Sequence, residues 1–255
     1  MLEKEILFKE ADNAIKWINE YVEKTGAKGV VIGNSGGKDS ATVIAMATRA
    51  LGKEKVITIA MPCNSISEDL EDAKLVANTF EVPILKIDIT ETYNEMETSI
   101  NNSLEMLDKS LIQEAKVNMK PRLRMTALYG VAQSLEYLVI GTGNLCEAMV
   151  GYTTKWGDSA SDFNPIANFT APEVLAIGEY LGVPDKIIKK APNDGLGGLT
   201  DEEKMGITYK QIEEYIETGK TDIDAMQIIE KRNRNSKHKR MQVPTYKFER
   251  TNFLN

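Results

Sequence analysis

Residues 29–40 constrain the fold of this chain more than any other stretch. They read Gly-Val-Val-Ile-Gly-Asn-Ser-Gly-Gly-Lys-Asp-Ser and are followed by a helical run from Ala41 to Leu51. A short β-branched segment, a glycine- and hydroxyl-rich turn and an amphipathic run are typical of a strand that leads into a helix. Unpaired N–H groups at such a helix start attract phosphate, and glycines let the anion approach the backbone. The stretch therefore predicts a site for a nucleotide triphosphate, with Asp39 as an oxygen ligand for Mg²⁺.

Two common phosphate-binding motifs do not fit this stretch. A Walker A loop needs one more residue between its first glycine and its Gly-Lys pair than lies between Gly33 and Gly37, and a Ser or Thr where Asp39 stands. A dinucleotide fingerprint needs a third glycine that residues 141–146 lack. A plain glycine turn that closes a β-α unit stays open as an alternative, although the added Asp and Ser residues disfavour it.

The composition is that of an acidic globular chain. Its 255 residues can form one large α/β domain, and no Pro/Gly/Ser-rich linker divides them, so we expect residues 1–255 to be a single domain. A net charge of −7 argues against a general nucleic-acid-binding protein. Residues 231–240 nevertheless carry six cations and no acid. This basic run is either a docking site for an anion or a solvated helix end whose cations suit the C-terminal dipole.

The cysteines and the apolar segments bear on location. Cys63 and Cys146 fit no zinc spacing and make no disulfide framework, which favours a reducing compartment. The polar start Met1–Glu5 is unlike a signal peptide, and no apolar run approaches the length of a bilayer span. We therefore expect a cytoplasmic protein that has no membrane segment.

Short apolar segments alternate with helical segments along the chain. Strands are predicted from Gly29 and at 56–61, 84–89 and 137–142, and helices at 3–25, 41–51, 91–107, 111–133, 171–181, 209–217 and 222–239, with another from Ser67. Pro121 should start or kink a helix. The alternation predicts an α/β fold, a doubly wound parallel sheet with helices on both faces. Because ligands bind at the carboxyl ends of such strands, the tips at 34–40, 61–65 and 141–147 should converge, and one crevice should hold Asp39 and Glu147.

The loop and several further blocks indicate a family. Ser-Gly-Gly-x-Asp-Ser at 35–40 resembles the pyrophosphate loop of the ATP pyrophosphatases, enzymes that split ATP between its α and β phosphates. The other blocks are 118–125, 141–147, 151–158, 162–166, 200–203, and 237–240 followed by Val243 and Pro244. With these blocks, the chain resembles an ammonia-dependent NAD synthetase, and the resemblance runs essentially from end to end.

The resemblance implies roles for particular residues. ATP would be held by Gly33, Asn34, Ser35, Gly36, Gly37, Lys38, Asp39, Ser40, Thr142 and Thr200. Mg²⁺ would be bound by Asp39 and Glu147, which would be the catalytic residues. Deamido-NAD would be bound by Arg122, Lys155, Asp162, His238 and Lys239. Cations and oriented hydrogen bonds suit a ligand with a pyrophosphate and a nicotinate carboxylate. Lys38 stands at the variable position of the loop, so we expect its side chain to be solvated.

The reaction implied is amidation of deamido-NAD with ammonia and ATP, through an adenylated dinucleotide, to give NAD, AMP and pyrophosphate. A homodimer and the absence of a glutaminase domain are implied as well. The alternatives are a related ATP pyrophosphatase that amidates another acid, and a non-catalytic adenine-nucleotide sensor. As weak support for the dimer, the helical stretch around Pro121 offers an apolar face of Leu123, Ala127, Leu128 and Val131, which burial against the chain's own sheet explains equally well.

The chain departs from the family pattern in two places. Many relatives have Thr-Lys where this chain reads Thr170-Ala171, so the cation that reaches the ATP phosphates is missing or is replaced by one nearby, such as Lys189 or Lys190. The loop at 192–196 reads Pro-Asn-Asp-Gly-Leu in place of the usual Pro-Ser/Thr-Ala-Asp-Leu, which predicts a different loop conformation.

Overall fold

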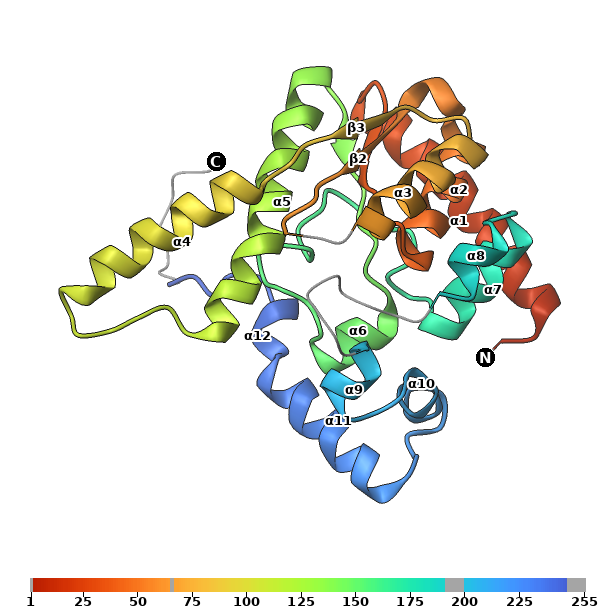
Figure 1. The fold of residues 1–255 in the computed structure, drawn as a ribbon. Coiled ribbons are helices and arrows are strands. Elements are labelled where there is room, and N and C mark those ends of the chain that lie inside the picture. The colour runs from red at the N-terminus through yellow and green to blue at the C-terminus, as the bar shows by residue number, and fades with distance from the viewer. Residues whose placement is uncertain (1, 65–66, 191–199, 247–255) are drawn as a thin grey trace, which may run out of the picture.

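The computed structural model describes residues 2–64, 67–190 and 200–246 (Figure 1). Its strands are β1 (Val30–Gly33), β2 (Val56–Ala60), β3 (Ile84–Lys86) and β4 (Leu138–Val139). Its helices are α1 (Lys4–Thr25), α2 (Lys38–Leu51), the 3-10 turn η1 (Lys53–Lys55), α3 (Ser67–Thr79), α4 (Thr90–Glu105), α5 (Gln113–Leu135), α6 (Leu145–Val150), α7 (Ala171–Tyr180), α8 (Asp185–Ile188), α9 (Asp201–Met205), α10 (Tyr209–Thr218), α11 (Ile223–Asn235) and α12 (Lys237–Arg240).

The strands of the described residues form one parallel sheet in the order β3-β2-β1-β4. The register aligns Val30 with Val56 on one side and with Leu138 on the other. Because β1 pairs with β2 on one edge and with β4 on the other, the direction of winding reverses between β1 and β4. That reversal is the switch point at which open α/β sheets bind ligands. The predicted parallel, doubly wound sheet is confirmed.

The alternation of side chains along β1 explains why helices cover both faces of the sheet. Val30 and Ile32 belong to the main core, in which residues of α1, α2 and α7 are buried against the sheet. Val31 points to the opposite face and joins a second core with Val139 of β4 and Ala132 of α5. A strand buried on both faces reads as a continuous apolar run, as residues 30–32 do.

The C-terminal helices form a separate cluster beside α6, in the lower part of Figure 1. Its buried side chains come from α6, α7, α9, α10 and α11 and the turn after α9, and they are Cys146, Val150, Ala171, Met205, Ile207, Tyr209, Ile212, Ala225 and Ile229. This cluster brings the start of α9 toward the carboxyl edge of the sheet, where the site lies.

Two predicted strands are longer than the observed ones, and the helix predicted at 222–239 is divided into α11 and α12. The strand predicted at 84–89 ends at Lys86, although the Ile87 and Ile89 N–H groups still donate to Ala60 and Pro62. The strand predicted at 137–142 is shorter: the Ile140 N–H still donates to the Val31 carbonyl of β1, but Ile140 also forms an isolated bridge with Phe163, and the ladder ends at Val139. Pro121, which was predicted to start or kink a helix, lies inside α5 and so does not start one.

None of the described helices is both long enough and apolar enough to cross a membrane.

Candidate active site

A cavity of about 650 Å³ lies at the carboxyl ends of β1 and β4. Its walls include seven of the eight predicted loop residues, namely Gly33, Asn34, Ser35, Gly37, Lys38, Asp39 and Ser40. The tip of β2 contributes Met61 and Pro62, and the segment after β4 contributes Thr142 and Glu147. The convergence of these strand tips, and the presence of Asp39 and Glu147 in one crevice, agree with the sequence-based expectation.

The loop at 34–40 is held by its own polar side chains. Asn34 is buried; its Nδ2 donates to the Ala73 carbonyl over 2.8 Å, and its Oδ1 accepts the Gly36 N–H over 3.1 Å. Ser35 Oγ accepts the Gly37 N–H over 3.2 Å. Helix α2 then starts at Lys38 with Gly37 as its N-cap, and no side chain of the described residues makes a cap hydrogen bond there. A helix start of this kind is suited to hold an anion.

The first turn of α2 places the Asp39 carboxyl in the cavity. Its Oδ1 is shielded from solvent and has no hydrogen-bond partner among the described residues. Burial raises the pKa of Asp39 to about 6, even though the Lys38 ammonium acts to lower it. A buried carboxylate oxygen without a partner is unfavourable unless a cation or a donor completes it.

Glu147 lies in the first turn of α6, where it has a structural role as well. Its Oε2 accepts the Asn144 N–H over 2.9 Å, and its N–H donates to Asn144 Oδ1 over 3.0 Å, which makes a capping box. Burial, and then the negative charge of Asp39, raise the pKa of Glu147 well above its usual value. The capping box engages the Oε2 oxygen, and among the described residues no hydrogen bond to the other carboxylate oxygen is found.

These two carboxylates fit a magnesium ion. They oppose each other's ionisation, Asp39 has an orphaned oxygen, and hard carboxylate oxygens are the ligands that Mg²⁺ prefers. A divalent ion would remove the repulsion between the two groups.

Asp201 is a cavity residue that sequence reasoning missed. It is the first residue of α9, it is buried, and its carboxylate accepts the hydroxyl of Tyr152 over 3.1 Å and that of Tyr209 over 3.4 Å. Thr200, which was predicted to contact ATP, is the N-cap of α9 and does not line the cavity. Its hydroxyl donates to Glu203 over 2.9 Å. The only sequence signal was the acidic block at 201–203, which is also an ordinary helix start.

The sequence suggested that the Lys38 side chain is solvated, but in the structure it also makes a contact within the protein. Its ammonium lies 5.5 Å from the centroid of the Tyr209 ring, which is a cation–π distance, and its side chain lines the cavity. The contact links the first turn of α2 to α10.

Of the residues predicted to bind deamido-NAD, only Lys239 lines the cavity. Its Nζ donates to the carbonyls of Gly151 and Thr153 over 2.8 and 2.6 Å. Arg122, Lys155 and His238 form a neighbouring group: Arg122 Nε donates to the Lys155 carbonyl over 3.3 Å, and Lys155 Nζ donates to the His238 carbonyl over 3.0 Å. The structure therefore brings three of the five together beside the cavity.

Asp162 lies elsewhere, at the edge of β4. Its Oδ2 accepts the Val139 N–H over 2.7 Å and its Oδ1 accepts the Tyr129 hydroxyl over 3.2 Å. These bonds hold the segment around Asp162 against β4 and α5.

The basic run at 231–240 matches neither interpretation fully. Arg232 donates to the carbonyls of Lys204 and Met205, and Arg240 donates to those of Ala148 and Asn233. Several cations of the run thus bind backbone carbonyls of neighbouring elements, while Arg232 and Lys239 also line the cavity.

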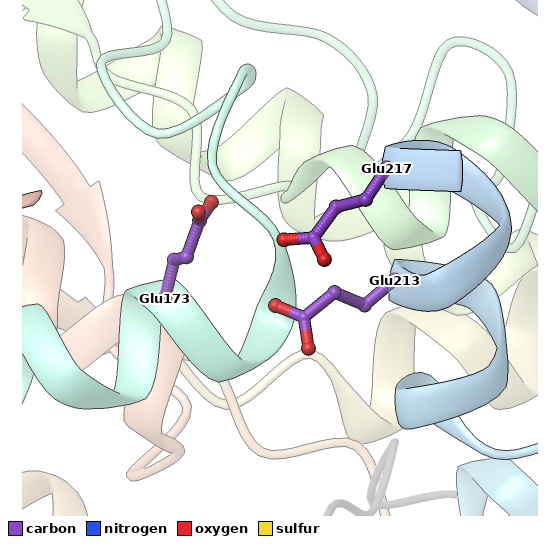
Figure 2. A group of neighbouring side chains, drawn as sticks. All are labelled: Glu173, Glu213 and Glu217. Carbon is purple, nitrogen blue, oxygen red and sulfur yellow. The ribbon is translucent and has the colours of Figure 1, made fainter. Parts of the chain in front are cut away.

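A second group of acids, Glu173, Glu213 and Glu217, lies outside the cavity between α7 and α10 (Figure 2). Glu173 accepts the N–H groups of Thr170 and Leu2, and Glu213 accepts the Thr170 hydroxyl over 2.7 Å. These bonds connect the start of α7 to α10 and to the N-terminal segment, so hydrogen bonding within the fold explains Glu173 and Glu213.

Comparisons with known proteins agree with this geometry. The family model described as NAD synthase matches residues 10–250. An NH(3)-dependent NAD(+) synthetase from Carboxydothermus hydrogenoformans is 42% identical over 230 residues, which cover 90% of this chain and 93% of that protein.

Two solved structures are similar over almost the whole chain. The NMN synthetase of Francisella tularensis has a TM-score of 0.89 at 31% identity, and covers 97% of this chain and 100% of its own. The NH3-dependent NAD synthetase of Campylobacter jejuni has a TM-score of 0.74 at 28% identity, with the same coverage of 97% and 100%.

Proposed function

This chain belongs to the NAD synthase family, and from that premise we propose that it amidates deamido-NAD with ammonia and ATP, giving NAD, AMP and pyrophosphate. The observation that carries the proposal is the single cavity that joins the phosphate loop, with its buried Asp39 oxygen, to Glu147 and to the segment at 151–158. A sensor that had lost catalysis would have no need of two opposed carboxylates, one with a buried oxygen, at the nucleotide site.

The reaction has two steps. The nicotinate carboxylate of deamido-NAD attacks the α phosphorus of ATP, and the bond to the β-phosphate oxygen breaks to release pyrophosphate. Ammonia then attacks the carboxyl carbon of the adenylated dinucleotide, loses a proton and displaces AMP. The N–H groups at the start of α2 would bind the phosphates and stabilise the charge that grows on pyrophosphate.

Asp39 and Glu147 would hold Mg²⁺ in this scheme. When bound, the ion supplies positive charge that neutralises the phosphates of ATP. The remaining assignments of the sequence analysis stay proposals, with Thr142 and the loop residues at ATP and with Arg122, Lys155, His238 and Lys239 at the dinucleotide. One domain and a cytoplasmic location are likewise proposed.

A second candidate reaction is the same amidation performed on nicotinate mononucleotide. The high TM-score to a structure described as an NMN synthetase favours it. The placement of Arg122, Lys155 and His238 beside the cavity rather than in its wall is compatible with either substrate. Both acids carry the same nicotinate carboxylate, so the adenylation and amidation steps are common to the two candidates.

Purified protein can separate the candidates in one experiment. We expect ¹⁵N-ammonium to be incorporated into NAD, with a kcat/KM for deamido-NAD that exceeds the value for nicotinate mononucleotide by more than about tenfold, a difference of about 1.4 kcal/mol. A reversed ratio would support the second candidate, and no amide from either acid would contradict both. Glutamine in place of ammonium should give no product, because Cys63 and Cys146 are buried and burial raises the pKa of both thiols.

We also propose that the enzyme is a homodimer. The apolar face named from the sequence is used within the chain, since Leu123 packs near Cys63 and Tyr93 while Leu128 and Val131 pack against the sheet. Better support comes from α4, which projects from the body in Figure 1, and from exposed apolar side chains around its connection to α5. These are Met106, Leu107 and Ile112, with exposures of 88%, 68% and 65%.

Leu107→Asp combined with Ile112→Asp should weaken self-association by more than about tenfold, because each variant side chain brings a charge to an apolar contact. Sedimentation velocity over a concentration series measures the shift. The matched control is Ile223→Asp on α11, since Ile223 is also 68% exposed but lies on another part of the molecule. A wild-type chain that stays monomeric and fully active at assay concentration would contradict the dimer.

A further inference from the structure

Position 171 is an alanine where many relatives have a lysine, and the structure distinguishes between the two nearby lysines that could replace it. Ala171 is buried beside Cys146 and Met205, and its N–H donates to Cys146 Sγ over 3.4 Å. Lys189 points away from the cavity; its side chain is 73% exposed and pairs with Asp185. Lys190 lines the cavity together with Ser35, Gly37 and Ser40.

Two aspartates of α3 hold Lys190 in this position. Its Nζ lies 2.9 Å from Asp69 Oδ1 and 2.7 Å from Asp72 Oδ2. Asp72 is fully buried, and its other oxygen lies 2.6 Å from Lys186 Nζ. Although burial acts to lower the pKa of Lys190, the bonds to Asp72 and Asp69 raise it, so the ammonium stays charged.

The same two aspartates touch the phosphate loop. A Cβ built on Gly36 would lie 2.8 Å from the Asp69 carbonyl oxygen and 2.8 Å from Asp72 Cβ. The backbone of α3 is therefore in close contact with the loop at Gly36, and Lys190, which α3 holds, lines the same cavity as the loop. Asn34 strengthens this contact by donating to the Ala73 carbonyl.

We propose that Lys190 is a phosphate-binding residue, which contacts the part of ATP that leaves as pyrophosphate. An ammonium has three N–H donors. Within the described residues two are used, by Asp69 and Asp72, so the third can donate to a phosphate oxygen without breaking either bond. The identity of the nucleotide rests on the proposed function, whereas the binding of pyrophosphate by Lys190 can be tested without it.

Three other cations of the cavity wall are engaged with other partners. Lys38 faces the Tyr209 ring, and Lys239 donates to two backbone carbonyls. Arg124 Nε donates to the Met61 carbonyl at the tip of β2. Lys190 differs from them because its ammonium is held by α3, whose backbone contacts the phosphate loop at Gly36.

Lys190→Met should weaken the binding of inorganic pyrophosphate with Mg²⁺ by about tenfold to a hundredfold, as expected for the loss of one charge-assisted hydrogen bond. Isothermal titration calorimetry with pyrophosphate measures this directly and needs no turnover. Lys190→Arg keeps the charge and should restore most of the affinity. If the wild type binds pyrophosphate but forms no amide, the proposed function is wrong, whereas the comparison of pyrophosphate affinities still tests the role of Lys190.

Lys186→Met is the matched control, because it removes the other partner of Asp72 and Lys186 does not line the cavity. Affinity lost in Lys190→Met alone supports the proposal. Equal losses in both variants, or none in either, overturn it, since the first result would mean a structural role and the second no role. If Lys190→Met does not fold, Lys190→Gln serves instead, because its amide can still donate to Asp72.

Discussion

Asp39→Asn and Glu147→Gln, each made alone, should lower the rate of adenylation by at least about a thousandfold, which corresponds to about 4 kcal/mol of transition-state stabilisation. Each variant replaces one charged oxygen ligand of the proposed Mg²⁺ with a neutral amide. In magnesium-free buffer the variants should melt at the temperature of the wild type or above it, because each removes one of two cavity carboxylates whose negative charges repel each other.

Two measurements check this expectation. Exchange of labelled pyrophosphate into ATP reports adenylation, and thermal melting with and without Mg²⁺ and ATP reports binding, since a ligand of the native state raises the melting temperature by mass action. Only the wild type should gain stability from magnesium. An Asp39→Asn protein that kept its exchange rate at limiting Mg²⁺ would remove the metal assignment.

Glu173→Gln is the matched control for Glu147→Gln. Both glutamates are the third residue of a helix that begins with a capping box, and glutamine can still complete that box. Glu173 does not line the cavity, so its variant should keep adenylation. If the two glutamine variants behave alike, helix capping alone explains Glu147.

The sequence predicted best the two segments that follow β1 and β4, because ligands of open α/β sheets bind at the carboxyl ends of the strands. The loop after β1 and the segment after β4 are each local in sequence, and parallel pairing brings their tips to one edge. The lengths of β3 and β4 were predicted less well. Their ends depend on partners such as Phe163, which bridges to Ile140 from a distant segment, and apolar periodicity does not report such partners.

Residues that reach the cavity from distant elements could not be placed from the sequence. Lys190 meets Asp69 across 121 residues, and Tyr152 meets Asp201 across 49. The sequence left Lys189 and Lys190 as equal candidates because they are neighbours, and the structure separates them by the direction in which each side chain points. Part of the predicted loop at 192–200, including all of 192–196, lies outside the described residues.

Substitution of Gly36 should have a large effect on both stability and nucleotide binding. Its φ is +73°, a left-handed conformation that strains other residues, and a Cβ there would meet the backbone and side chain of α3 at 2.8 Å. Gly36→Ala should therefore lower the free energy of unfolding by about 2–4 kcal/mol, as backbone strain and overpacking add. Binding of ATP should weaken by more than about a hundredfold, since relieving the clash moves the phosphate loop away from α3 and Lys190.

Gly26→Ala separates the two causes, because Gly26 also has a φ of +73° but nothing lies within 4 Å of the position its Cβ would take. At the end of α1 this variant should cost only about 1 kcal/mol, the strain of the left-handed conformation, and should leave ATP binding unchanged. Urea unfolding and titration with ATP on both variants give the comparison. If Gly36→Ala loses no more stability than Gly26→Ala and still binds ATP, the contact between Gly36 and α3 does not fix the loop. In that case this contact would not place Lys190 beside the loop either.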